Sequence, residues 1–221
     1  MRWHVANGAH RTEGQFDEGL RERLWSTWRS DGSALCRGAY QRGLREGDWC
    51  AWHTDGVVAR EGAYIAGRRH DLWRSWHANG QLASELHHLH GLRHGTWKRW
   101  HRNGELAEQG ERMSGQLIGA FGAWHLGGAS RASGEYHLGR RSGPWRLGFG
   151  DGRPQAEGTF VDGRLEGWWT ESWDTGGRKS EGEYRSGLRE GPWNFWHRDG
   201  SQDAARSGLY SDGTHRPERD A

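Results

Sequence analysis

Aromatic and apolar residues return along this chain at a fixed spacing of 24 residues. We number repeat positions from 0 to 23, starting at each member of the longest series. Position 7 is glycine in every repeat from Gly8 to Gly200. A fixed period of this length is typical of a repeat architecture. Position 0 is occupied by Trp25, Trp49, Trp73, Trp97, Phe121, Trp145, Trp169 and Trp193.

The residues between the aromatics predict β-hairpins. Positions 6 and 7 usually read Asp-Gly or Asn-Gly, as in Asp55-Gly56, which favours a two-residue type I′ turn. Glycines at positions 18 and 22 predict a longer glycine-rich turn into the next hairpin. We therefore expect an all-β fold, a single-layer antiparallel meander of roughly nine tandem hairpin repeats.

The expected turn sets the strand register. If the Asp-Gly turn has two residues, position 0 faces position 13 and position 3 faces position 10. Position 13 is usually glycine, which leaves room for the large ring opposite it. Position 15 is usually Tyr or Phe and shares a face with position 0, because side chains alternate along a strand. This predicts an aromatic ladder of Trp25, Tyr40, Trp49, Tyr64 and Trp73.

The ends of the chain depart from the repeat. The first unit has Met1 and His4 where other units have tryptophan, and the last unit slips by two residues after Trp196. We expect one array over residues 1–213, with an N-terminal cap at 1–23 and a C-terminal cap at 193–213. Residues 214–221 are expected to form a flexible tail.

A second tryptophan series stands at position 3 and should point away from the ladder unless a bulge intervenes. It could form an exposed binding surface, or it could shield the second face of a thin sheet. His88 and Arg112 replace the aromatic at position 15, which leaves two alternatives: function overrides packing at these positions, or the repeat has drifted. The candidate binding-face residues are Trp28, Trp52, Trp76, Trp100, Trp124, Trp196, His88 and Arg112.

Composition narrows the function classes. The chain has 16 Trp and 5 Tyr, which supply apolar area for a core, and its net charge is +2. Near-neutral charge argues against a nucleic-acid binder or a general binder of anionic membranes. Two cysteines, Cys36 and Cys50, cannot form a disulfide framework and fit a reducing compartment. The N-terminus has no apolar segment typical of a signal peptide, so we expect a cytoplasmic protein.

Residues 47–67 carry a recognisable pattern. They read Gly-Asp-Trp-Cys-Ala-Trp-His-Thr-Asp-Gly and then, from Glu61, Glu-Gly-Ala-Tyr-Ile-Ala-Gly. This pattern resembles the MORN repeat, in particular its second variant, seen in YwqK-type antitoxin-like proteins. The resemblance implies a solenoid of hairpins used for protein association, sometimes beside a partner toxin. In eukaryotic relatives it implies membrane association.

Histidines suggest metal chemistry, but their spacing opposes it. Equivalent residues of successive repeats lie two strands apart, about 9–10 Å, too far to share one zinc ion. The denser cluster His87, His88, His90 and His94 leaves two alternatives, a weak divalent-metal site or surface histidines in a degenerate repeat. The recurring residues at position 4 are His53, His77, His101, His125 and His197.

The sequence contains no constellation of nucleophile and base, so we expect neither an enzyme nor a cofactor. The leading hypothesis is a scaffold that mediates protein–protein interaction, with antitoxin-like neutralisation of a partner protein. The alternative is a peripheral phospholipid-binding module acting through exposed Trp and Arg. Stacking on glycans or single-stranded nucleic acid is a third hypothesis. The oligomeric state is left open.

Overall fold

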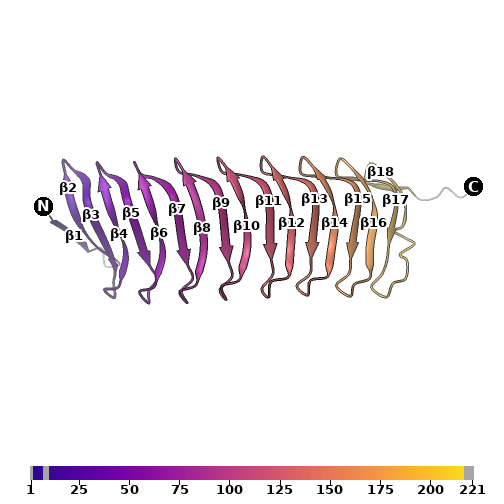
Figure 1. The fold of residues 1–221 in the computed structure, drawn as a ribbon, viewed down its shortest axis with the longest axis horizontal. Helices are drawn as coiled ribbons and strands as arrows, with labels where there is room; N and C mark the ends of the chain where they lie inside the picture. Colours follow the sequence, from indigo (N-terminus) through magenta and orange to yellow (C-terminus); the bar gives the residue numbers. More distant parts are fainter. Residues whose placement is uncertain (1, 7–9, 217–221) are drawn as a thin grey trace, which may run out of the picture. The chain divides into compact units, whose positions relative to one another are not determined.

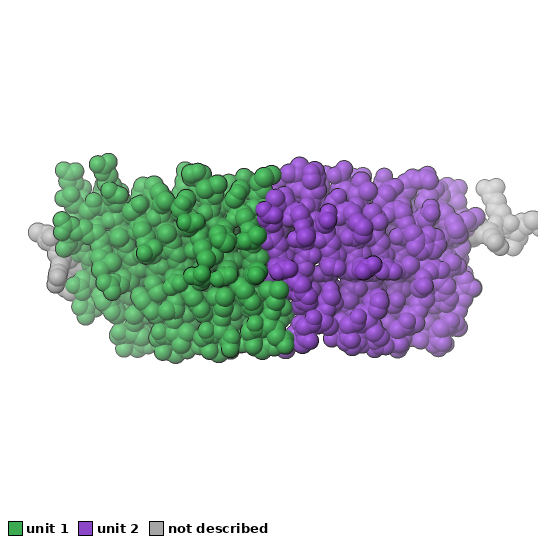
Figure 2. Space-filling model, viewed as in Figure 1, with its two compact units in different colours: residues 1–106, 112–115 green, residues 107–111, 116–221 purple. Residues whose placement is uncertain are grey.

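The computed structural model describes residues 2–6 and 10–216, and within those ranges it contains strands and turns but no helix. The chain divides into two compact units (Figure 2). Unit 1 comprises residues 1–106 and 112–115, and unit 2 comprises residues 107–111 and 116–221. Strand β10 (Leu106–Met113) contributes residues to both units. Each unit is described by itself below.

Unit 1 is an open antiparallel meander in which each strand pairs with the next along the chain (Figure 1). Its strands are β1 (Arg2–Ala6), β2 (His10–Asp17), β3 (Leu20–Arg29), β4 (Ala34–Gln41), β5 (Leu44–Trp52), β6 (Val58–Ile65), β7 (Arg68–Trp76), β8 (Leu82–Leu89) and β9 (Leu92–Trp100).

Unit 2 has the same meander topology. The predicted all-β fold of tandem hairpins is therefore confirmed. The strands of unit 2 are β11 (Gln116–Trp124), β12 (Ser130–His137), β13 (Arg140–Gly148), β14 (Pro154–Val161), β15 (Arg164–Ser172), β16 (Arg178–Arg185), β17 (Leu188–Phe195), β18 (Gly208–Ser211) and β19 (Thr214–Arg216).

The Asp-Gly turns differ from the prediction. Of the central pair Asp55-Gly56, only Gly56 has a positive φ, at 84°, so the turn is not type I′. The His53 N–H donates to the Val57 carbonyl at 2.8 Å, and the Gly56 N–H donates to the His53 carbonyl at 3.1 Å. These bonds close a three-residue loop with glycine in the left-handed region. The Asp55 carboxylate accepts the Val57 N–H at 3.1 Å, which favours this form.

The tight turns lie at the opposite end of each hairpin. Gln41 pairs with Leu44, leaving only Arg42 and Gly43 in the loop. Both have positive φ, at 48° and 79°, the signature of a type I′ turn. The sequence analysis therefore assigned the two turn types to the wrong ends of the hairpin. Positions 17 and 18 form the two-residue turn, and positions 5 to 7 form the longer one.

The longer loop changes the register only near the turn. Trp52 pairs with Val58 at position 9, and not with position 10 as predicted. A bulge between Ala51 and Trp52 then shifts the register by one residue. Trp49 consequently pairs with Gly62, as predicted. The extra turn residue and the bulge compensate each other, so the predicted pairing of position 0 with position 13 is confirmed.

The chain ends add one difference. Residues 214–216, expected in the flexible tail, form β19, which pairs with β18 from Leu209 opposite Arg216 to Ser211 opposite Thr214. The rest of that tail, residues 217–221, lies outside the described residues, as does Met1 of the proposed N-terminal cap.

Candidate binding surfaces

The aromatic ladder covers one face of the sheet, which we call the ladder face. In unit 1, neighbouring rings meet edge to face. The ring centroids of Tyr40 and Trp49 are 5.1 Å apart, and those of Trp49 and Tyr64 are 5.9 Å apart. In unit 2, Trp145 contacts Tyr136 and Phe160 in the same way, at 5.1 and 6.1 Å. Because its position-0 tryptophans are buried, the ladder is the core of this thin fold.

A register shift fixes the orientation of four of the buried indoles. Gly38 of β4 pairs with Trp49 of β5, but the next residue, Ala39, pairs with Glu46. The extra residues of β5 at this point include Gly47, which has a φ of 64°. The Ala39 carbonyl accepts the Trp49 indole N–H at 3.0 Å. The same bond joins Trp73 to Ala63, Trp145 to Glu135 and Trp193 to Glu183. The indole can lie flat over the strand because the residue beneath it is glycine.

A row of arginines at position 20 packs on the ladder, and the sequence analysis did not identify it. The Arg45 guanidinium lies 4.7 Å from the Trp49 ring centroid and donates to the Tyr64 hydroxyl at 2.9 Å. Burial opposes the charge of Arg45, but hydrogen bonding to Tyr40 and Tyr64 outweighs it and raises the pKa. The 24-residue count would have revealed this row: Arg21, Arg45, Arg69, Arg141 and Arg189 all contact position-0 rings.

His88 and Arg112 occupy ladder positions in unit 1. The His88 ring lies 6.4 Å from the Trp73 ring and is only 6% exposed. Its Nδ1 is buried and has no hydrogen-bond partner among the residues that the structure describes. The Arg112 guanidinium lies 5.6 Å from the Trp97 ring centroid and donates to the Gly115 carbonyl at 2.7 Å. Both residues therefore substitute for a packed aromatic and are not available as an open surface.

Burial is the main reason that the pKa of His88 is lowered, and the positive charge of Arg69 lowers it further. A histidine whose pKa is lowered on folding contributes stability above its unfolded pKa of about 6.5, and that stability is lost as the pH falls towards the folded value. We expect His88→Tyr to raise the melting temperature and to flatten its decline below about pH 6.5. Thermal unfolding at several pH values tests this. His137→Gln, at an exposed histidine, is the control, and an unchanged pH profile in H88Y would contradict the assignment.

The position-3 tryptophans lie on the other face, which we call the back face. Trp52 lines this face with Cys50, whereas Trp49 belongs to the ladder. The structure therefore separates the six candidate tryptophans from His88 and Arg112 and does not bring the eight residues into one site. The six side chains are half-buried, as shielding of a thin sheet requires: Trp28, Trp52, Trp76, Trp100, Trp124 and Trp196.

Position 4 ties each hairpin to the next. His53 Nε2 lies 2.9 Å from the Trp76 carbonyl oxygen, so this nitrogen carries the hydrogen and donates. His77 and His125 make the same bond, and Trp173 makes it with its indole N–H at 3.1 Å. These nitrogens are engaged in structural bonds. Among the described residues, no group of three or more His, Cys, Asp or Glu could hold a metal ion.

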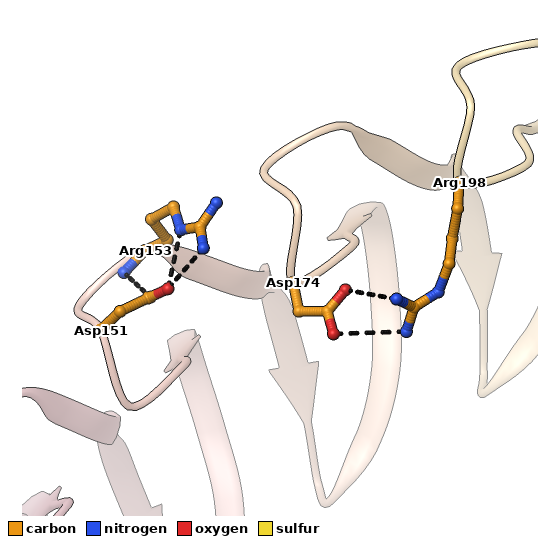
Figure 3. Close-up of polar contacts among 4 residues, drawn as sticks. All are labelled: Asp151, Arg153, Asp174 and Arg198. Carbon is orange, nitrogen blue, oxygen red and sulfur yellow. Dashed lines mark hydrogen bonds and ion pairs between the residues drawn. The ribbon is translucent and has the colours of Figure 1, made fainter.

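Ion pairs follow the three-residue turns of unit 2 (Figure 3). Asp151 accepts from Arg153 at 2.6 Å within one turn, and Arg198 pairs with Asp174 of the preceding turn at 2.9 Å. The hydrogen bond from Arg153 lowers the pKa of Asp151. The Arg198 guanidinium also lies 5.1 Å from the Trp173 ring centroid. All four charged side chains are exposed. Each carboxylate is paired with a guanidinium, so these ion pairs hold the turns together and leave no net charge at this surface.

Exposed apolar side chains gather at the tight turns, a feature that the sequence analysis missed. Positions 16 and 19 flank the two-residue loop on the back face. The Leu44 side chain packs within 3.4 Å of the Cβ position of Gly67 in the next turn, yet about half of Leu44 is exposed. The exposed members of this turn-edge row in unit 1 are Leu20, Leu44, Ile65, Leu89, Leu92 and Met113.

Unit 2 exposes a tryptophan on the back face. Trp168 is 50% exposed although its neighbour Trp169 is buried. It pairs across the sheet with Glu183. Exposed Pro144 and Pro192 occupy the same repeat position in the neighbouring repeats. Pro192 in turn pairs with Leu209, which is also exposed. Trp168 therefore stands in a column across the back face of unit 2 in which apolar residues on alternate strands are separated by polar residues such as Thr159 and Glu183.

The fold and these surfaces define a repeat-type binding module. The family model of the MORN repeat variant matches residues 72–90 and 93–112, so this part of the chain is similar to MORN repeats. None of the curated proteins searched matches the chain. MORN repeats are commonly protein- or membrane-interaction repeats and are not a known enzyme family. Within residues 2–6 and 10–216, no helix is long and apolar enough to cross a membrane.

Proposed function

We propose that this protein is a non-enzymatic scaffold that binds another protein through its back face. Exposed Trp168 carries the proposal. Large exposed aromatic side chains mark interaction sites, and tryptophan contributes disproportionately to binding energy at interfaces. Pro144, Pro192 and Leu209 of the same column are also exposed, while the ladder face has its rings buried beneath arginines. The reducing environment suited to free Cys36 and Cys50 supports a cytoplasmic location.

We expect Trp168→Ser to reduce capture of the partner by at least about tenfold, the effect of losing a hot-spot side chain of at least 1.4 kcal/mol. The free energy of unfolding should change by less than about 0.5 kcal/mol, because the side chain is half-exposed and outside the core. Affinity capture from the native host, quantified by mass spectrometry, provides the measurement. The matched control is Leu126→Ser, at another exposed apolar residue of unit 2 that lies in a three-residue turn. Equal capture by W168S and wild type would refute the role of this column.

The resemblance to antitoxin-like MORN proteins extends the proposal to neutralisation of a toxic partner. In that case, co-expression should rescue cells from a toxin encoded beside this gene, and W168S should rescue poorly. Full rescue by W168S would show that Trp168 is not needed for neutralisation of the toxin.

Membrane binding is a second candidate, supported by the turn-edge row, where exposed Leu20 and Leu44 share their repeat position and their face with exposed Arg68. Apolar side chains beside basic ones suit an interface with anionic lipid. Sedimentation with vesicles containing phosphatidylserine separates the two candidates. Co-sedimentation that is lost in the double variant Leu20→Ser/Leu44→Ser would favour the membrane, and protein remaining in the supernatant would favour the protein partner.

A further inference from the structure

A groove of about 800 Å³ crosses the back face of unit 1, with lining residues from β3 to β7. Five strands at about 4.8 Å spacing give the groove a length of about 19 Å. An extended peptide of five or six residues spans this distance, at about 3.3–3.6 Å per residue. The volume falls within the range typical of binding pockets, roughly 300–1,000 Å³. The groove therefore has room for a short extended segment.

Apolar side chains form part of the lining. Leu24 on β3 is 47% exposed, and Trp52 on β5 and Leu72 on β7 are half-buried. A half-buried tryptophan offers contact area to an apolar side chain without losing its own support in the sheet. This lining favours a ligand with at least one large apolar side chain.

Charge decides the class of ligand. The lining carries three carboxylates, Asp48, Glu61 and Asp71, and two guanidiniums, Arg37 and Arg74. Arg74 is already paired with Glu85, its Nε lying 3.0 Å from the carboxylate oxygen. The groove is therefore acidic. Consistent with this, burial and the charge of Glu61 raise the pKa of the Cys50 thiol, which also lines the groove.

One of the three carboxylates stands on strained backbone. Asp71 has a φ of 57°, at the repeat position where Gly47 and Gly95 occupy the same left-handed region. Aspartate is tolerated there better than most residues, but glycine avoids the strain. Asp71 stands where other repeats have glycine, so it places a carboxylate at the groove and introduces backbone strain.

We propose that this groove binds an extended segment of the partner protein in which a large apolar side chain is flanked by lysine or arginine. The inference rests on the proposed scaffold function and assigns the chemistry of the partner. The apolar side chain contacts Trp52, on the middle strand of the groove, and the basic side chains face Asp48, Glu61 and Asp71. Opposite charges at such an interface raise the association rate and select the partner.

The test uses the full chain and a fluorescein-labelled heptapeptide with central leucines flanked by lysines, beside an analogue in which glutamates replace the lysines. We expect the basic peptide to bind at least about tenfold more tightly, with an affinity that falls as salt is added. The triple variant Asp48→Asn/Glu61→Gln/Asp71→Asn should abolish this preference. Asparagine suits the left-handed conformation of residue 71. Equal binding of both peptides to wild type would overturn the proposal.

The control is a triple variant with the same change of charge on exposed carboxylates of unit 2, Asp162→Asn/Asp174→Asn/Asp212→Asn. Asp162 matches Asp71 because its φ is 49°. This variant should keep the preference for the basic peptide. Cys50 supplies a second measurement: in a Cys36→Ser background, bound peptide should slow the reaction of Cys50 with a thiol reagent. An unchanged labelling rate at saturating peptide would place the peptide elsewhere and overturn the assignment.

Binding of the natural partner to wild type and to the groove triple variant distinguishes failure of this inference from failure of the scaffold proposal. A partner that binds wild type and the groove triple variant equally would overturn the groove assignment and leave the scaffold proposal standing. If the host supplies no protein partner, the scaffold proposal itself fails, whatever the peptides do.

Discussion

Replacement of Trp145 by alanine is expected to lower the free energy of unfolding by about 3–5 kcal/mol, the usual cost of truncating a large buried aromatic. Trp145 is 1% exposed and lies among Phe121, Tyr136 and Phe160. Its indole N–H also donates to the Glu135 carbonyl at 3.1 Å. The substitution therefore leaves a cavity within the ladder and an unpaired carbonyl beneath it.

Urea denaturation followed by circular dichroism measures the loss in Trp145→Ala, and hydrogen exchange of the amides in β13 localises it. Trp145→Phe should recover part of the packing but not the indole hydrogen bond. Trp168→Ala provides the comparison, because the same residue type is removed from an exposed position. If W145A and W168A lost equal stability, the distinction between the ladder and the back face would fail.

The ladder could be predicted from sequence because its members repeat in identity as well as in spacing. The glycine at position 13 makes room for the aromatic of the following repeat: a Cβ at Gly38 would lie 2.1 Å from the Trp49 ring. The arginines at position 20 repeat with the same spacing. They could therefore have been found by the same count, and their contacts with the rings explain the abundance of arginine in the repeat.

The turns could not be assigned with the same certainty. Asp-Gly suits a type I′ turn and equally a three-residue loop that ends in left-handed glycine. The choice depends on the bond from the Val57 N–H to Asp55, which no residue count reveals. At the other turn, residues such as Ala66 and His90 adopt positive φ although their side chains give no sign of it. There the strand pairing imposes the conformation.

The candidate surfaces were predictable only in part. The position-3 series drew attention because it repeats, yet its members are half-buried. Trp168 was missed because its repeat position has no constant identity and is occupied by Leu24, Asp48 and Leu72 in unit 1. Periodicity identifies what every repeat needs for folding. A residue that acts in one repeat is found from its exposure, which depends on the folded chain.

Gly134→Ala is expected to lower the free energy of unfolding by about 3 kcal/mol, at the upper end of the usual range for overpacking. A Cβ at residue 134 would lie 2.3 Å from Cδ2 of the Trp145 indole. The ring cannot move aside, because Phe121, Tyr136 and Phe160 surround it. The φ of Gly134 lies outside the left-handed region, so the expected loss reflects steric overlap and not backbone strain.

Gly150→Ala is the matched control in the same unit, because its added Cβ would meet nothing within 4 Å and its φ is also outside the left-handed region. It should be neutral or stabilising by up to about 1 kcal/mol, through the reduced entropy of the unfolded chain. The decisive measurement is a double-mutant cycle. In a Trp145→Ala background the steric overlap is gone, so Gly134→Ala should cost less than about 1 kcal/mol. An undiminished cost in that background would show that the glycine serves the strand itself and not the indole that lies over it.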